Sequence, residues 1–131
     1  GVQVRMIVRG ICCLLPELPG KTENIHITSI VGRFLEHSRI YCFGQGSQER
    51  MYIASADFMT RNTLRRVEVA APVYDEDAKN RLRHIFDTIM LDDEKGKEQQ
   101  ADGSYTDRHI NPTPLNSQEV FYEEAYEASK S

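Results

Sequence analysis

A histidine and an arginine, His37 and Arg39, stand two residues apart just before the apolar run 40–43. We expect this run to form a buried strand, because four apolar residues follow a polar stretch. Side chains two residues apart on an extended chain point to the same side, so His37 and Arg39 are predicted to face one cleft. An imidazole can transfer a proton near neutral pH, and a guanidinium matches phosphate oxygens. The pair therefore predicts a phosphate-handling site.

Further polar side chains follow other predicted strands. Arg9 and Gly10 come after the aliphatic run 2–8, and ligands of parallel sheets bind at the carboxyl ends of strands, so Arg9 is a candidate phosphate ligand. The alternative is an exposed arginine at a strand end. We do not find a glycine-rich P-loop pattern, so side chains would have to hold the phosphates.

The segment 55–62 follows a predicted strand at 50–54 and indicates a pocket wall. Ser55 and Asn62 could form hydrogen bonds there, and Asp57 could orient a cation. An equally good interpretation is a turn at the start of a helix, capped by Ser55 or Asp57. The complete set of candidate site residues is Arg9, His37, Arg39, Ser55, Asp57, Arg61 and Asn62.

The remaining pattern predicts one α/β domain over residues 1–131. Strands are expected at 24–31, at 65–71 with an end at Pro72, and at the sheet edge in 105–110. The clearest helix is 75–91, capped by Asp75, and a second helix at 117–130 is capped by Asn116. The polar segment 92–103 is predicted to be a loop.

Composition and charge argue against several classes of protein. The chain has 40% hydrophobic residues and a net charge of −4, and no apolar run approaches a membrane span. We expect a cytoplasmic protein. Residues 1–72 carry a charge of +3 and residues 73–131 a charge of −7, which argues against nucleic-acid binding. The three cysteines lack the spacing of zinc ligands and are predicted to be reduced core residues, so no metal site is expected.

Five segments together resemble the final domain of polyphosphate kinase. They are Val8-Arg-Gly-Ile-Cys-Cys-Leu, Glu23-Asn-Ile, the stretch 29–41, Ser55-Ala-Asp-Phe-Met-Thr-Arg-Asn and Arg65-Arg-Val-Glu-Val. They cover about the first 70 positions in the family's order and at close to its spacing. The resemblance implies an α/β domain of phospholipase-D-like architecture, with a mixed β-sheet flanked by α-helices, as the C-terminal catalytic fragment of a longer enzyme.

The resemblance also implies a reaction. Polyphosphate kinases reversibly transfer the terminal phosphate of ATP to polyphosphate through a phosphohistidine, which lies in the preceding domain. By this likeness His37 is the second active-site histidine, which contacts the nucleotide phosphates and serves as general acid or base, and Arg9 is the nucleotide-phosphate arginine. Arg39, Ser55, Asp57, Arg61 and Asn62 are expected to be pocket neighbours.

The expected cofactor is ATP with Mg²⁺, whose protein ligands would lie outside this chain. The expected partners are ATP, ADP, polyphosphate, the other domains of the enzyme and further copies of it. The chain alone is expected to be inactive, because phosphoryl transfer needs all its parts in position.

Two alternatives stay open. His37-Ser-Arg39 resembles a variant of the phospholipase D His-x-Lys motif, but arginine replaces lysine, and Phe43 and Gly44 occupy the region of its acidic residue. This departure argues against phosphodiesterase chemistry. The chain could instead be a structural or oligomerisation module whose phospholipase-D-like site has decayed.

Overall fold

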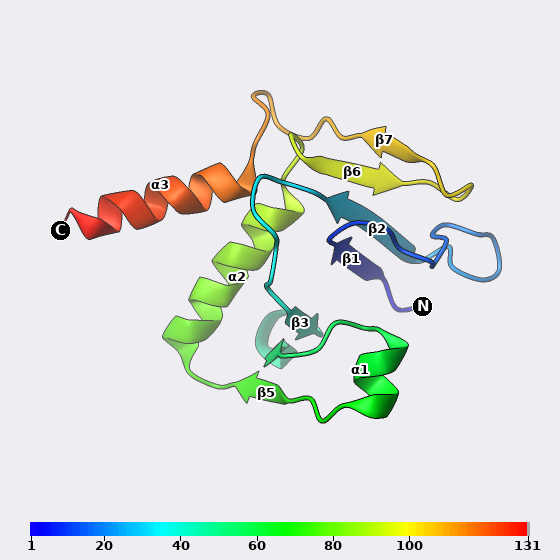
Figure 1. The fold of residues 1–131 in the computed structure, drawn as a ribbon, viewed down its shortest axis with the longest axis horizontal. Coiled ribbons are helices and arrows are strands. Elements are labelled where there is room, and N and C mark those ends of the chain that lie inside the picture. The colour runs from blue at the N-terminus through cyan, green and yellow to red at the C-terminus, as the bar shows by residue number, and fades with distance from the viewer. Residues whose placement is uncertain (131) are drawn as a thin grey trace. The chain divides into compact units, whose positions relative to one another are not determined.

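The computed structural model describes residues 1–130, which fall into two compact units. The first unit comprises Gly1–Glu36 and Thr88–Ser131, and the second comprises His37–Asp87. Figure 1 shows the elements of each. That residues 1–131 act as a single domain stays a prediction.

The first unit is built on a mixed four-stranded sheet. Its strands are β1 (Val4–Val8), β2 (Ile25–Ile30), β6 (Gly96–Gln99) and β7 (Tyr105–Asp107), in the order β1-β2-β6-β7. β1 and β2 are parallel, whereas β6 and β7 are antiparallel to their neighbours. Ile27 and Ile30 on β2 form the centre of the core. Since Val8 is aligned with Ser29, the segments that follow β1 and β2 leave the sheet at the same edge.

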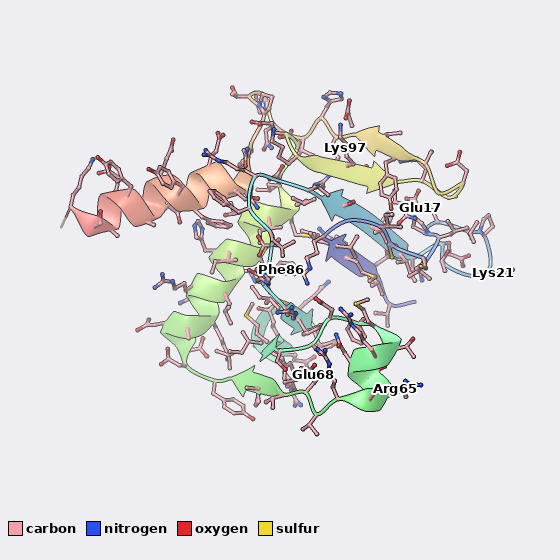
Figure 2. The ribbon with its side chains drawn as sticks, in the orientation of Figure 1. Glu17, Lys21, Arg65, Glu68, Phe86 and Lys97 are labelled. Carbon is pink, nitrogen blue, oxygen red and sulfur yellow. The ribbon has the colours of Figure 1, made fainter. Side chains whose placement is uncertain are left out.

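The prediction of a loop at 92–103 is wrong, because β6 lies inside this segment between β2 and β7. β6 has the polar sequence Gly-Lys-Glu-Gln, and backbone pairing on both sides makes up for its lack of apolar side chains. An ion pair between Lys97 and Asp107 also joins β6 to β7. Figure 2 labels Lys97 among the side chains of the chain.

The first unit ends in helix α3 (Ser117–Ser129). The Asn116 side chain caps it by accepting hydrogen bonds from the backbone N–H groups of Gln118 and Glu119, so the predicted cap is confirmed. Beyond its first two turns the helix is exposed on all sides.

The second unit contains an antiparallel sheet in the order β3-β4-β5. β3 (Ile40–Phe43) and β4 (Arg50–Ala54) form a hairpin around the short 3₁₀ helix η1 (Gly46–Gln48), with Met51 buried. Both strands have the predicted bounds. Helix α2 (Glu76–Met90) follows the sheet, and Asp75 Oδ2 accepts a hydrogen bond from the N–H of Ala78, as predicted for a cap.

The prediction of a strand at 65–71 that ends at Pro72 is wrong. Residues 60–65 form helix α1 (Thr60–Arg65), and strand β5 is Ala70–Val73, with Pro72 inside it. Proline has no N–H to donate to a neighbouring strand, so it is disfavoured in a strand that is paired on both sides. Within residues 1–130, β5 is an edge strand that pairs with β4 alone, so Pro72 is tolerated there.

All three cysteines are free thiols, but only Cys12 and Cys42 are partly buried, so the core position predicted for Cys13 is wrong. No helix within residues 1–130 has both the length and the apolar character needed to cross a membrane.

Candidate functional site

Arg9 lies at the sheet edge where β1 and β2 end, beside a hollow of about 190 Å³. Gly10 has a φ of 108°, a backbone conformation that favours glycine, and its carbonyl accepts a 2.7 Å hydrogen bond from Ser29 Oγ. This bond ties the turn after β1 to β2. Arg9 is exposed, and its Nη1 donates to the Glu36 carbonyl at 3.0 Å.

The segment 31–36 forms the rest of the hollow's wall, together with Ile30. It carries a second arginine, Arg33, whose guanidinium carbon lies 5.5 Å from the centre of the Phe34 ring. Arg33 lies in the stretch 29–41 but was not among the predicted site residues, and its type and its place just after a predicted strand could have pointed to it. The residues that line the hollow include two arginines and one acidic residue, Glu36. This wall therefore carries a net positive charge, which suits an anion.

Arg39 and Asp57 form an ion pair in the second unit. Arg39 Nε is 3.0 Å from Asp57 Oδ1, and Nη2 is 3.4 Å from Oδ2. The hydrogen bond to Asp57 is the main reason that the pKa of Arg39 lies above its usual value. Arg39 Nη1 also donates to the His37 carbonyl at 3.1 Å, so one guanidinium links His37 to the segment after β4.

Asn62 is the most buried of the predicted site residues, with 6% of its surface exposed. Its Nδ2 donates to the Asp57 carbonyl at 3.1 Å, while Oδ1 has no hydrogen-bond partner among the described residues. Neither Ser55 nor Asp57 caps α1, because the N-cap is Met59 and no side chain bonds there. Asp57 therefore organises Arg39 and Asn62 instead.

The other predicted residues have different contacts or surroundings. The Ser55 hydroxyl donates to the Glu68 carboxylate and accepts from Val69 N–H at 3.0 Å, which closes the loop between β4 and β5. Arg61 is exposed on α1, and His37 is exposed just before β3. Arg9 belongs to the first unit and the other six residues to the second. The convergence of Arg9 and His37 on one site stays a prediction.

A second hollow of about 320 Å³ lies within the second unit, and aromatic side chains line much of it. Tyr41 and Phe58 meet edge to face there with ring centres 5.6 Å apart, and burial raises the pKa of the Tyr41 hydroxyl. Ala56, Asp57 and Phe58 of the predicted pocket wall at 55–62 line this hollow. The rest of its lining comes from β3, β4, β5, α1 and the loop before β5, which no local pattern brings together.

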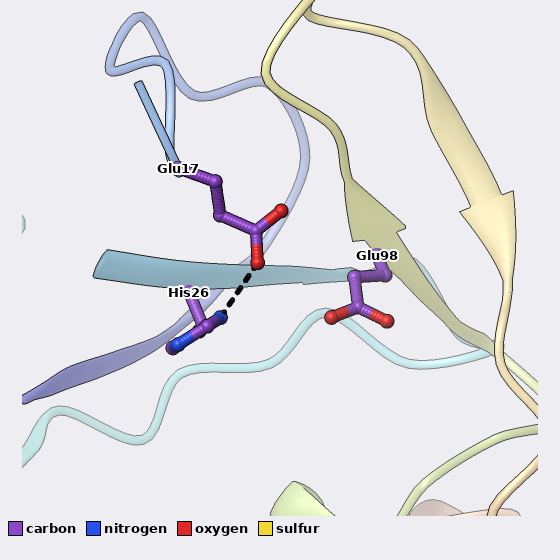
Figure 3. A group of neighbouring side chains, drawn as sticks. All are labelled: Glu17, His26 and Glu98. Carbon is purple, nitrogen blue, oxygen red and sulfur yellow. Dashed lines mark ion pairs between the residues drawn. The ribbon is translucent and has the colours of Figure 1, made fainter. Parts of the chain in front are cut away.

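Three groups from separate segments approach one another in the first unit (Figure 3). The Glu17 carboxylate lies 2.9 Å from His26 Nδ1, and an oxygen of Glu98 completes a set of ligand atoms within 4.8 Å of one another. This set has the chemistry to hold a cation. Glu17 and His26 are both partly exposed, and the ion pair between them explains why they lie close together in the absence of a cation.

The predicted site residues do not fit a magnesium ion by themselves. Asp57 is the only carboxylate among them, and both of its oxygens face Arg39. A Mg²⁺ ion prefers one or two carboxylates that are free to bind it, with waters and substrate phosphates.

The chain is similar to known proteins over nearly all of its length. Residues 1–118 match the family model described as polyphosphate kinase C-terminal domain 2. A polyphosphate kinase of Staphylococcus haemolyticus is 49% identical over 95% of this chain and 17% of its own length. One of Halalkalibacterium halodurans is 43% identical over 100% of this chain and 19% of its own length. The chain thus spans about a fifth of the length of these relatives.

A solved structure gives the same result for the fold. The crystal structure of polyphosphate kinase from Porphyromonas gingivalis matches with a TM-score of 0.87 and 35% identity, over 98% of this chain and 20% of that chain. This likeness confirms the predicted α/β, phospholipase-D-like fold class.

Proposed function

This chain belongs to the polyphosphate kinase family, through its second C-terminal domain, and we propose that it supplies part of the active site of an ATP:polyphosphate phosphotransferase. In the proposed reaction a histidine outside this chain takes the terminal phosphoryl group of ATP, and ADP leaves. The N–P bond then breaks as an oxygen at the end of polyphosphate attacks the phosphorus. The same steps run in reverse to make ATP.

The observation that carries the proposal is the place of Arg9. The parallel pairing of β1 and β2 puts it at a sheet edge, beside a hollow whose wall carries a second arginine. A guanidinium offers two parallel N–H donors, so it suits the oxygens of a nucleotide phosphate. Such contacts stabilise the charge that develops on the transferred phosphoryl group.

His37 is proposed as the second active-site histidine. As an exposed imidazole before β3, it would contact the nucleotide phosphates and exchange a proton at the attacking or leaving oxygen. Arg39 supports it through the hydrogen bond to the His37 carbonyl, and Asp57 fixes the guanidinium of Arg39. Ser55, Arg61 and Asn62 are proposed as neighbours of this site.

Several properties of the whole enzyme belong to the same proposal. The enzyme would act in the cytoplasm as a homo-oligomer, and it would use Mg²⁺ bound by groups outside this chain. Since the phosphorylated histidine would also lie outside, the isolated chain should show no turnover.

Replacement of His37 in the full-length enzyme tests the proposal. His37→Ala is expected to reduce polyphosphate synthesis at least about 100-fold, the usual scale for loss of a general acid or base. Thermal unfolding should not change. His109→Ala, which removes another exposed histidine, is the matched control and should keep full activity. Retention of activity by His37→Ala would contradict the proposal.

One observation favours a second function, as an assembly module. Phe58 and Val67 in the second unit expose 80% and 98% of their surfaces, and large exposed apolar side chains often mark protein interfaces. Phe58→Ser with Val67→Ser would shift a homo-oligomer toward smaller species in sedimentation if the chain carries subunit contacts. Loss of assembly, with His37→Ala fully active, would favour this function over catalysis.

A further inference from the structure

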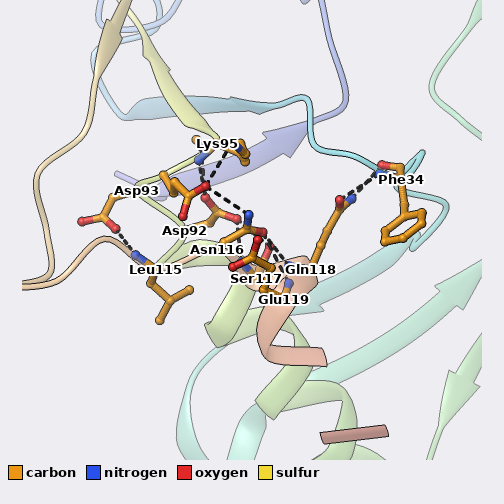
Figure 4. A network of polar contacts seen from close by, with 11 residues as sticks. Phe34, Asp92, Asp93, Lys95, Leu115, Asn116, Ser117, Gln118 and Glu119 are labelled. Carbon is orange, nitrogen blue, oxygen red and sulfur yellow. Dashed lines mark hydrogen bonds and ion pairs between the residues drawn. The ribbon is translucent and has the colours of Figure 1, made fainter. Parts of the chain in front are cut away.

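The side-chain amide of Gln118, in the first turn of α3, forms hydrogen bonds with both backbone polar groups of Phe34. Gln118 Oε1 accepts a hydrogen bond from Phe34 N–H at 2.9 Å, and Nε2 donates to the Phe34 carbonyl at 2.7 Å (Figure 4). The two residues are 84 positions apart in the sequence. The amide therefore holds segment 31–36 as a neighbouring strand would.

Gln118 is itself held by a buried anchor. Ser117 donates its N–H at 2.8 Å and its hydroxyl at 2.7 Å to one carboxylate oxygen of Asp92, which is 0% exposed. The other oxygen of Asp92 accepts the N–H groups of Lys95 and Gly96. The first turn of α3 is thus fixed to the start of β6, and the Gln118 side chain leaves from a rigid base.

Gly32 allows the close approach of Gln118 to segment 31–36. A Cβ atom built at Gly32 would collide with the side-chain amide of Gln118. The backbone of Gly32 is not in the left-handed region, so this contact, and not the backbone conformation, disfavours a larger residue here.

Burial contributes little to holding segment 31–36. Val31, Phe34 and Leu35 expose 70%, 57% and 65% of their surfaces, so packing does not fix the segment. The same segment lines the hollow beside Arg9, and the carbonyl of Glu36 accepts the hydrogen bond from Arg9. A displacement of the segment would therefore move both the wall of the hollow and the partner of Arg9.

We propose that Gln118 is a positioning residue that holds segment 31–36 in the conformation in which Arg9 binds the phosphates of ATP. This inference rests on the proposed function. It assigns a role in nucleotide binding to the first turn of α3, through two hydrogen bonds and the contact with Gly32.

The test uses the full-length polyphosphate kinase that contains this chain. Gln118→Met keeps the length of the side chain and removes both hydrogen bonds, and Glu123→Met on the exposed part of α3 is the control. Gln118→Met is expected to raise the KM for ATP about tenfold, as two lost hydrogen bonds would. It should also speed hydrogen exchange in a peptide covering residues 31–36.

A merely structural role would have different effects. It would lower the amount of active enzyme, and so kcat, and leave KM unchanged. Gln118→Met with unchanged exchange at 31–36, or with faster exchange and an unchanged KM, overturns the positioning role. The unsubstituted enzyme shows separately whether the proposed function holds, because its failure to make polyphosphate would refute that function and with it this role.

A double-mutant cycle tests the contact itself. Gly32→Ala should raise the KM for ATP in the unsubstituted background and have little further effect beside Gln118→Ala, because the smaller side chain leaves room for the added methyl group. Equal effects of Gly32→Ala in both backgrounds would overturn the inference.

Discussion

The guanidinium of Arg39 lies against the carboxylate of Asp57, with Nε 3.0 Å from Oδ1. This contact joins the residue before β3 to the segment after β4, and the backbone carbonyl of Asp57 also accepts a hydrogen bond from the buried Asn62. Asp57 thus connects two other candidate site residues. Asp57 thereby holds the guanidinium of Arg39 in place, and its part in a phosphate site stays a prediction.

Loss of the Asp57 charge should weaken the second unit. Asp57→Asn is expected to lower the free energy of unfolding by about 1 kcal/mol, the upper range for a partly exposed ion pair with two contacts. Urea denaturation measures this change. Glu76→Gln, which removes an exposed ion pair with Lys79, should have a smaller effect. An Asp57→Asn variant as stable as the unsubstituted protein would show that the pair contributes nothing.

The buried carboxylate of Asp92 should be among the most sensitive positions in the first unit. Asp92→Ala leaves the N–H groups of Lys95, Gly96 and Ser117 without their acceptor. We expect a loss of about 3 kcal/mol in the free energy of unfolding, as for other buried polar networks. Thermal and urea unfolding of the variant measure it, and a loss below about 1 kcal/mol would contradict the anchor proposed for α3.

Asp93 should make stability depend on pH. Hydrogen bonds from the N–H groups of Leu115, Asn111 and Ile110 hold its pKa well below the usual value of 3.8. A depressed folded-state pKa gives stability that is present above the unfolded value and is lost as pH falls through the folded value. Unfolding free energies measured from pH 5 down to pH 2 should therefore decrease.

The Asp93→Asn variant is the control for this pH dependence. Its neutral amide does not titrate, so its stability should fall less steeply over the same range. Equal slopes for both proteins would show that Asp93 does not cause the decrease.

The local parts of the fold could be predicted from the sequence. The bounds of β3 and β4 follow from short apolar runs beside a glycine-rich turn, and the caps Asp75 and Asn116 act within three residues of themselves. The failures at β6 and β5 have a nonlocal cause. A polar segment becomes a strand when strands on both sides pair with it, and a proline is tolerated in a strand at the sheet edge. Which strands lie beside a segment cannot be read from its local sequence.

The candidate site was predictable to a similar extent. Residue type and position at strand ends selected Arg9, Arg39 and Asp57, and the structure places Arg39 and Asp57 in direct contact. Residue type also suggested a pocket role for Ser55, whose hydroxyl binds Glu68 and Val69; that role stays a prediction. The contact between Gln118 and Phe34 spans 84 residues, so no pattern within a short window could reveal it.

The central claim is that this chain supplies the arginine that binds the phosphates of ATP, and its most direct test is the KM for ATP of the full-length enzyme with Arg9→Ala. Arg5→Ala, which removes another exposed arginine from β1, is the matched control. We predict a rise in KM of at least about tenfold for Arg9→Ala, because a hydrogen bond to a charged group contributes about 1.5–3 kcal/mol, and no change for Arg5→Ala. An Arg9→Ala enzyme with the unsubstituted KM and kcat would contradict the claim.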